Sequence, residues 1–400
     1  MRIAKLEDLH ADAGWRVHSF LKLTTDEGLI GWCEYNEQFG AGGVSELIRR
    51  FASVVVGMDP REVGLISAAL HASSLLAAGG LNHQAVAAIE NACFDVKAKA
   101  LGVPVCALFG GPYRKQLPLY WSHCGSFRVW QRELFEEQLG RPPIRTLDDL
   151  TALGGEAAAR GFGALKTNPL PIGADTRAFN PGFHIRPGFL DRMPDDRLLA
   201  GLRDVIAAFR AGAGPHVGVM LDLNFGQRPE GILRVARALE ELNLAWLEFD
   251  LHDPDALAFI RRSARLPIAS LETLHGQRAY RPYFQNESID VAIVDVLWNG
   301  MLESVRIANL ADVYEVDVAP HNFYGDLASL MSAQFCAAIP NFRIMEYEVD
   351  DVPWKSELVS HPPVIENGEL VLSVRPGWGA DVNEDAVRAH PPKGRTHDRA

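Results

Sequence analysis

Short apolar runs alternate with amphipathic segments through most of the chain after Leu117. The runs have the length of buried strands, and most are followed by a helical pattern such as Ile232–Leu242 or Leu302–Val313. Regular alternation of strand and crossover helix predicts a (β/α) barrel of parallel strands rather than a doubly wound sheet. The expected strands are Leu117–Trp121, Ala164–Lys166, Gly218–Asp222, Ala245–Glu248, Ile268–Glu272, Val291–Asp295, Asp317–Ala319 and Ile344–Glu346.

The first part of the chain has a different pattern. Val17–Thr24 alternates between apolar and polar residues, Asp26–Gly28 is a turn signal, and Leu29–Tyr35 returns, which predicts a hairpin. Asn82–Leu101 is rich in alanine with apolar residues at helical spacing, and Gly102 ends it. We therefore expect an α+β domain over residues 1–114.

Three further boundaries follow. The barrel occupies residues 115–354, and residues 355–390 contain a strand-like stretch, Gly368–Ser373, that we expect to return to the first domain. The polar tail 391–400 is expected to fray. The gaps 125–146 and 174–196 are too long for simple crossovers, and as loops after strand ends they would lie over the active face.

Composition excludes several classes of function. The 400 residues are 48% hydrophobic and carry a formal charge of −12 with no basic cluster, so nucleic acid is not an expected partner. The five cysteines form no C-x-x-C pair and are expected to be reduced core residues. Neither a signal peptide nor a membrane span is visible, so we expect a cytoplasmic protein with no membrane partner.

Acidic residues near the ends of three expected strands point to a metal. Glu248 follows Asp222 by 26 residues, and Glu272 follows Glu248 by 24. That spacing is about one strand, one helix and two loops, which in a parallel barrel brings all three carboxylates to one face. They would repel each other unless a cation lay between them, and oxygen ligands suit Mg²⁺. Taken singly, each is more readily explained as a turn residue or a solvated loop acid than as a metal ligand.

Other residues complete a resemblance to a known family. The chain resembles the mandelate racemase-like branch of the enolase superfamily in two places. The segment from Asn91-Ala-Cys-Phe-Asp95 through Leu108-Phe-Gly-Gly111 resembles the end of that family's first domain. The three acids are then followed, in the family's order, by Asp295, His321 and Glu346. The resemblance implies a modified (β/α)₇β barrel with a capping domain built from both chain ends. It also implies one Mg²⁺ held by Asp222, Glu248 and Glu272, a His321–Asp295 dyad as base, and a homo-oligomer.

The implied chemistry begins by removing a proton beside a carboxylate, with a cation stabilising the resulting enediolate. Lys166 would hold the substrate carboxylate or sit near the reacting carbon, and Glu346 would hydrogen-bond the enediolate. Asn168 stands where the branch often has a second lysine base, which weakens racemisation. Glu248-Phe-Asp250 replaces the frequent Glu-Glu-Pro.

A Mg²⁺-dependent dehydratase of a sugar acid is therefore the leading hypothesis, since one base can remove the α-proton and then assist loss of a β-hydroxyl. A racemase, epimerase or cycloisomerase on the same scaffold and a non-catalytic metal- or sugar-acid-binding barrel remain alternatives. The small-molecule carboxylate substrate would also meet residues in or near strand-end loops. These candidates are Asn168, Asn224, His123, Arg186, Arg278 and Trp298, although a surface role is equally ordinary for the arginines.

Overall fold

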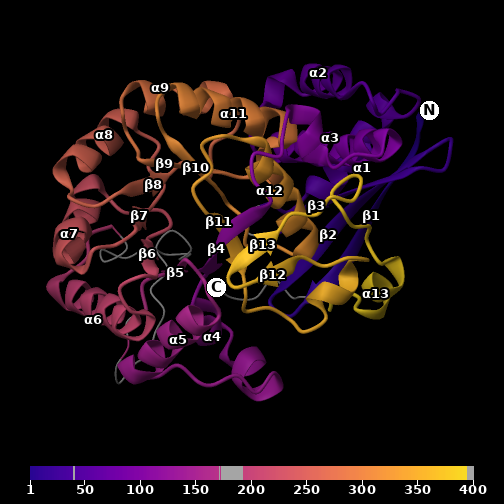
Figure 1. The fold of residues 1–400 in the computed structure, drawn as a ribbon. Helices are drawn as coiled ribbons and strands as arrows, with labels where there is room; N and C mark the ends of the chain where they lie inside the picture. Colours follow the sequence, from indigo (N-terminus) through magenta and orange to yellow (C-terminus); the bar gives the residue numbers. More distant parts are fainter. Residues whose placement is uncertain (39–40, 171, 173–191, 394–400) are drawn as a thin grey trace.

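The computed structural model describes residues 1–38, 41–170, 172 and 192–393. An antiparallel sheet and three helices form the first domain (Figure 1). Its helix α3 lies close to strand β3 because Gly31 has no side chain: a Cβ there would meet the carbonyl oxygen of Ala92 at 2.3 Å. The elements are β1 (Ile3–Ala13), β2 (Arg16–Thr25), β3 (Ile30–Tyr35), α1 (Val44–Val55), α2 (Val63–Ser73) and α3 (Gly80–Leu101).

The second part is a ring of parallel strands with helices outside it (Figure 1). The strands pair in chain order from β4 to β10, and β11 pairs with β4 on the other side. Between β10 and β11 the connection is an isolated parallel bridge, Val318–Phe342, rather than a ladder. The strands are β4 (Gln116–Ser122), β5 (Ala164–Thr167), β6 (Gly218–Asp222), β7 (Trp246–Glu248), β8 (Ile268–Ser270), β9 (Val291–Val294), β10 (Asp317–Pro320) and β11 (Met345–Glu348).

The helices of this ring follow the strands as the sequence predicts. Two of them, α5 and α6, pack closely together. The helices are α4 (Ser126–Trp130), α5 (Leu147–Ala159), α6 (Asp196–Ala213), α7 (Pro229–Leu239), α8 (Pro254–Ser263), α9 (Gln277–Gln285), α10 (Val296–Asn299), α11 (Met301–Val313) and α12 (Asp326–Ala338). No helix in the described part of the chain is both long and apolar enough to cross a membrane.

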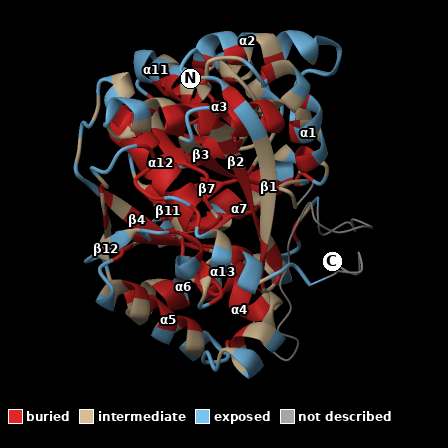
Figure 2. Ribbon diagram, turned by 90° about the vertical axis from the view of Figure 1, so that its right-hand side faces the viewer, coloured by how far each residue is buried: buried red, intermediate tan, exposed pale blue. Residues whose placement is uncertain are grey.

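Inward-facing apolar residues fill the part of the barrel nearer the amino-terminal ends of its strands. Tyr120, Ala164, Met220, Trp246, Ala269, Val291, Ile293 and Ala319 form one buried cluster. Successive strand residues face opposite sides, so the residue two positions later faces the same interior nearer the carboxyl end. Figure 2 shows that buried residues concentrate in the inner strands, such as β2, β3, β7 and β11, and in α3 and α12, whereas β1 is mostly half-buried.

Three expectations about the elements were wrong. The strand expected to reach Glu272 ends at Ser270, because Leu271 has a positive φ of 91° and leaves the ladder. The stretch 125–146 is not a plain loop, because it contains α4 and the π-helical turn η3 (Glu133–Gln138). The strand-like stretch Gly368–Ser373 forms β13 (Glu369–Val371), which pairs with β4 of the barrel rather than with the first domain. Most of 174–196 lies outside the described residues.

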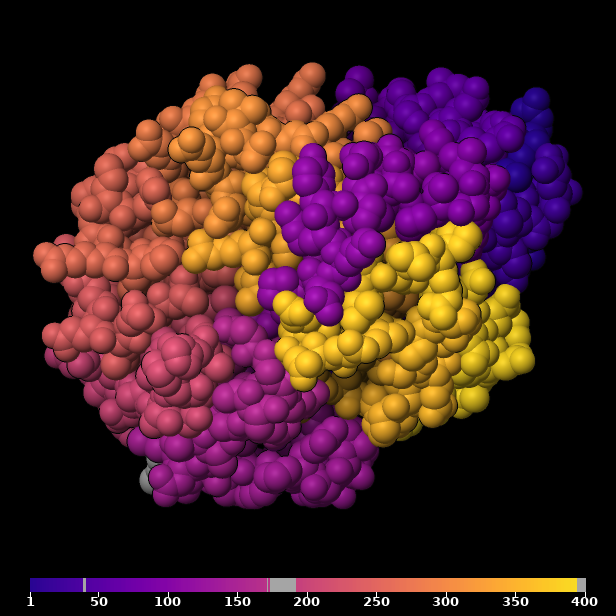
Figure 3. All heavy atoms as spheres, in the orientation of Figure 1, coloured from indigo at the N-terminus to yellow at the C-terminus, as the bar shows by residue number. Residues whose placement is uncertain are grey.

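The segment after the barrel touches both parts of the molecule. Strand β12 (Val364–Glu366) forms a hairpin with β13, while α13 (Glu384–Ala389) lies against β1. In Figure 3 this segment, in yellow, forms a continuous part of the surface beside the violet first domain. Within residues 355–390, contacts with the first domain are therefore made after β13, by Trp378 and α13.

Glu34 of β3 links the two parts directly. Its carboxylate accepts hydrogen bonds from the backbone N–H groups of Gly325 (2.7 Å) and Ala328 (2.9 Å). These are unpaired donors at the start of α12, which a carboxylate is well suited to satisfy. The first domain thus holds the amino terminus of a barrel helix.

Candidate active site

The period of two along each strand places polar side chains at one end of the barrel. Two residues beyond the interior residues Ala164, Met220, Trp246, Ile293 and Ala319 come Lys166, Asp222, Glu248, Asp295 and His321, all buried. The expected convergence of strand-end residues therefore follows from the same alternation that builds the core.

Lys166 lies among four carboxylates, here called the acidic group: Asp222, Glu248, Glu272 and Glu346. Its Nζ lies 2.9 Å from both Glu248 Oε1 and Glu346 Oε1, and 3.8 Å from Asp222 Oδ2. Burial alone would lower the pKa of Lys166, yet Glu248 and Glu346 hold it well above its ordinary value. The ammonium group therefore stays charged and neutralises one of several buried carboxylates.

The three candidate metal ligands influence each other strongly. Burial raises the pKa of Asp222 to about 7, with a further contribution from Glu248. Burial also holds the pKa of Glu272 well above its ordinary value, against the effect of His321, and both Asp222 and Glu248 contribute to the rise. The single positive charge of Lys166 does not balance these carboxylates. Their oxygens are the donors that Mg²⁺ prefers.

The side chains are not arranged as a finished metal site. Within the described residues, no three His, Cys, Asp or Glu side chains are close enough together to hold one ion. The donor types fit a divalent cation.

Glu272 reaches the site through an unusual turn. The residue two positions after interior Ala269 is Leu271, but its positive φ turns the chain, and Leu271 is buried elsewhere in the core. The backbone N–H groups of Leu271 and Thr273 both donate to Asp250, at 2.6 and 2.9 Å. Asp250 thus holds both neighbours of Glu272.

His321 and Asp295 form the expected dyad. His321 Nδ1 lies 2.6 Å from Asp295 Oδ2, and the same oxygen accepts a hydrogen bond from the Tyr324 hydroxyl at 2.7 Å. The other oxygen of Asp295 accepts the backbone N–H groups of Leu297 and Trp298 at the start of α10. With Nδ1 committed to Asp295, Nε2 is the nitrogen that faces Glu272 Oε2 at 3.7 Å.

The acidic neighbours of His321 favour its protonated form. Burial alone would lower the pKa of His321, but Glu272 and Asp295 raise it to about 10.

Glu346 is fixed on several sides. It accepts hydrogen bonds from the Ser122 hydroxyl and the Asn322 backbone N–H, both at 2.6 Å. Although burial would raise its pKa, Lys166 and His321 lower it below the ordinary value. The carboxylate therefore stays ionised beside Lys166.

The other sequence candidates divide into two groups. Asn168 lies against Asp222, whose backbone oxygen its amide approaches at 3.4 Å, and its Oδ1 is buried without a hydrogen bond among the described residues. Asn224 donates its backbone N–H to Asp222 at 2.8 Å. The ring of Trp298 lies 5.0 Å from that of His321.

The remaining candidates lie at the edge of this centre or away from it. His123 Nδ1 lies 2.9 Å from both Glu348 and the Ser122 hydroxyl, and that hydroxyl donates to Glu346. Burial lowers the pKa of His123 to about 3. Arg278 is exposed on α9 and makes no hydrogen bond or ion pair with the acidic group among the described residues. Arg186 lies outside the described residues.

Sequence reasoning missed several residues that hold this centre. Ser122 follows interior Tyr120 by two positions, so counting along the strand could have found it. Tyr324, Asn322 and Asp250 carry no local signal, because their roles depend on contacts between different strand ends.

Comparison with known proteins agrees with this architecture. Residues 16–110 match the mandelate racemase/muconate lactonizing enzyme amino-terminal domain, and residues 152–386 match the enolase carboxy-terminal-domain-like family. The chain belongs to the mandelate racemase/muconate lactonizing enzyme branch of the enolase superfamily. Enzymes of this superfamily use Mg²⁺ with a Lys or His base.

Two curated relatives extend over nearly the whole chain. D-xylonate dehydratase of Haloferax volcanii is 27% identical over 382 residues, covering 94% of this chain and 86% of the relative. D-galactarolactone cycloisomerase of Agrobacterium fabrum is 26% identical and covers 93% and 90%.

A solved structure from Burkholderia xenovorans strain LB400 is more similar. It is 42% identical with a TM-score of 0.94, covers 98% of this chain and 99% of its own, and bears the provisional name L-alanine-DL-glutamate epimerase. A second crystal structure under that name contains magnesium and fumarate.

Proposed function

We propose that this enolase-superfamily protein is a Mg²⁺-dependent dehydratase of a sugar acid, forming a 2-keto-3-deoxy acid. One observation carries the proposal: Asp295 orients the His321 ring through Nδ1, while the neutral Asn168 lies beside Asp222. A site with one oriented base suits removal of a proton followed by loss of a leaving group. The D-xylonate dehydratase relative supports this class of reaction.

The metal would be held by Asp222, Glu248 and Glu272, whose mutual repulsion a divalent cation relieves. When bound, the ion would hold the substrate carboxylate and stabilise negative charge developing on its oxygens. Lys166 and Glu346 already contact each other and would orient the same end of the substrate.

The proton transfers fall to His321. Its Nδ1 donates to Asp295, which fixes the orientation of the ring. Burial lowers the pKa of His321, whereas Glu272 raises it, so a Glu272 carboxylate neutralised by a cation would leave Nε2 deprotonated and able to take the α-proton. The resulting imidazolium then gives that proton to the β-hydroxyl, which departs as water. The enol left behind gains a proton on the β-carbon as it becomes the 2-keto-3-deoxy acid, so the net change is loss of one water.

The test is a panel of aldonic and aldaric acids with purified protein and Mg²⁺, assayed for 2-keto acids. We expect at least one acid to be dehydrated and His321→Asn to lose that activity by about 10³-fold or more, while remaining folded. Exposed His361→Asn is the matched control. Turnover that survives His321→Asn unchanged contradicts the assigned base, and a panel without product contradicts the reaction.

Epimerisation is the second candidate, favoured by the 42% identical relative with an epimerase name. Its second base would be Lys166 in its deprotonated form, which requires that substrate and metal reverse the rise in its pKa that Glu248 and Glu346 cause. Incubation with L-Ala-L-Glu in D₂O separates the two reactions. Deuterium at the α-carbon with inversion and no loss of water favours epimerisation, whereas keto-acid formation from a sugar acid favours dehydration.

A further inference from the structure

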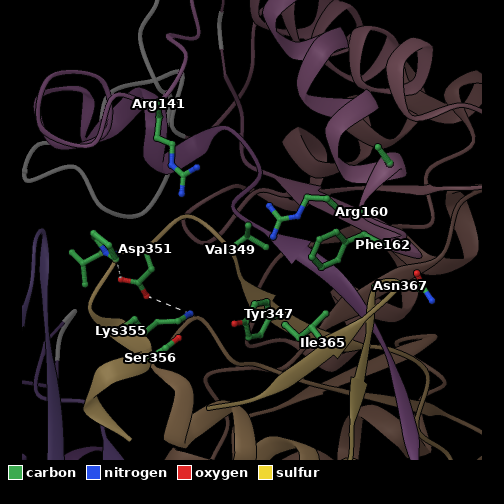
Figure 4. Close-up of a pocket in the computed structure, with 14 residues that line it drawn as sticks. Arg141, Arg160, Phe162, Tyr347, Val349, Asp351, Lys355, Ser356, Ile365 and Asn367 are labelled. Atoms are coloured by element: carbon green, nitrogen blue, oxygen red, sulfur yellow. Dashed lines mark hydrogen bonds and ion pairs between the residues drawn. The ribbon is translucent and has the colours of Figure 1, made fainter. Parts of the chain in front are cut away.

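Figure 4 shows a cavity of about 490 Å³ that is lined by none of the candidate active-site residues. It lies outside the barrel, on a different side of the strands from those residues. Strand alternation explains the separation: Glu346 of β11 faces the barrel interior, whereas Tyr347 and then Val349 face outward and line the cavity. Its volume is within the range of small-molecule sites.

Three cationic side chains enter this cavity from three elements. Arg141 follows the turn η3, Arg160 follows α5, and Lys355 begins the short helix η5 (Lys355–Leu358). Figure 4 shows all three charged ends turned toward the same space beside Val349. The cavity wall contains one carboxylate, that of Asp351.

The positive charges are only partly neutralised. Lys355 lies 3.6 Å from both Asp351 and Asp326, and Asp351 is also paired with Arg16. The cavity carboxylate is therefore already shared between two cations.

Arg160 and Arg141 supply the surplus. Arg160 pairs at 3.3 Å with Glu156, which also faces Arg128 at 3.7 Å. The guanidinium of Arg141 has no hydrogen bond or ion pair among the described residues; the nearby Asp350 carboxylate, which acts on Arg141 at longer range, is paired with Arg128 at 2.9 Å. In a chain with a formal charge of −12, a cavity wall with surplus positive charge is a distinctive feature.

The cavity also has a partly apolar wall that holds two cations in place. The guanidinium carbon of Arg160 lies 5.0 Å from the ring of Trp121 and 5.4 Å from that of Phe162. The Lys355 ammonium lies 4.7 Å from the Tyr347 ring. Aromatic contacts of this kind orient a cation without using its hydrogen-bond donors.

We propose that this cavity binds a small organic anion with at least two negative charges, either a polycarboxylate or a phosphate monoester. Arg141 and Arg160 present planar forks that match either oxyanion, and Phe162 with Ile365 accommodates the body of the molecule. The proposal does not depend on the reaction at His321.

The experiment is calorimetric titration with glutarate and, separately, with glycerol 3-phosphate, at constant chloride and with Mg²⁺ in excess. We expect saturable binding of one probe or both. Arg141→Gln and Arg160→Gln should each weaken it about tenfold or more, because each removes a charge-assisted contact. Exposed Arg50→Gln, on α1, is the matched control and should leave binding unchanged.

The two probes identify the chemistry, because glutarate binding indicates a carboxylate ligand and glycerol 3-phosphate binding a phosphate ester. The proposal is overturned if neither probe binds saturably. It is also overturned by binding that is equally tight in Arg141→Gln and Arg160→Gln, since the anion then sits elsewhere, including the candidate active site. Thermal unfolding of each variant establishes that a loss of binding is not a loss of folding; Arg141 is exposed, so its variant is the decisive one.

Discussion

Asp250 holds Leu271 in a backbone conformation that a non-glycine residue rarely adopts. The Leu271 N–H donates to the Asp250 carboxylate at 2.6 Å, and the φ of Leu271 is 91°. Such a conformation is strained and persists only where surrounding contacts maintain it. The consequence is that Glu272 turns toward the rest of the acidic group where simple alternation would have put a leucine.

Asp250→Asn should therefore weaken Mg²⁺ binding without touching the proposed ligands. We expect a loss of about tenfold or more, the usual effect of removing a group that orients a ligand. Calorimetric titration with Mg²⁺ measures it directly. Asp204→Asn, on the exposed face of α6, is the control, and an unchanged dissociation constant in Asp250→Asn would falsify the positioning role.

Lys166→Met should leave the buried acids without their charge partner. Breaking a buried ion pair on one side costs about 3–5 kcal/mol of the free energy of unfolding. We expect a lower Tm in metal-free buffer and a larger Mg²⁺-induced rise in Tm than the wild type shows. The control is exposed Lys115→Met, and equal Mg²⁺ responses in all three proteins would refute a shared cation site.

The buried carboxyl group of Glu90, which lies outside the active site, should make the stability of the protein depend on pH. Burial raises its pKa to about 7 from 4.5, although its carboxylate accepts the Leu302 backbone N–H at 3.1 Å. The folded protein thus keeps a proton that the unfolded chain releases, so stability is fully present below pH 4.5 and is lost as pH rises through 7.

Glu90→Gln removes this effect because its amide oxygen still accepts from Leu302 but cannot ionise. Between pH 5 and 8 the free energy of unfolding of the wild type should fall by on the order of 3 kcal/mol more than that of the variant. Urea unfolding at both pH values measures the difference. Exposed Glu46→Gln should behave as the wild type, and parallel pH curves for Glu90→Gln and wild type would exclude the assignment.

Gly212 allows α5 and α6 to pack closely. A Cβ there would lie 1.8 Å from the carbonyl oxygen of Thr151, so Gly212→Ala forces the helices apart. We expect destabilisation of about 1–3 kcal/mol or more, as for other overpacked sites. Gly201→Ala, in the same helix with open space around it, should instead be neutral or stabilising by up to about 1 kcal/mol. Similar unfolding curves for the two variants would contradict the packing argument.

Local pattern was sufficient for the elements that repeat. Short apolar runs predicted β5, β6 and β7, and the position of Lys166, Asp222 and Glu248 at the ends of those runs predicted that they lie on one face of the barrel. The helix from Gly80 to Leu101 was also clear, because the glycine after it adopts the left-handed conformation that ends helices.

Contacts distant in the sequence were not predictable. Pairing of β13 with β4 joins residues more than 250 positions apart, and nothing in Gly368–Ser373 specifies its partner. The turn at Leu271 is equally hidden, because its cause is a carboxylate on the preceding strand end. Tyr324 shares Asp295 with His321 only once the barrel has formed.

The bonds from Glu34 to Gly325 and Ala328 have a consequence for recombining family members. A Cβ on Gly325 would lie 2.6 Å from the Glu34 carboxylate, so this glycine and this acid form a matched pair across two halves of the chain. A chimaera that joins this barrel to the first domain of another protein must import a glutamate at the same place. Without it, the loop bearing His321 would begin its next helix unanchored.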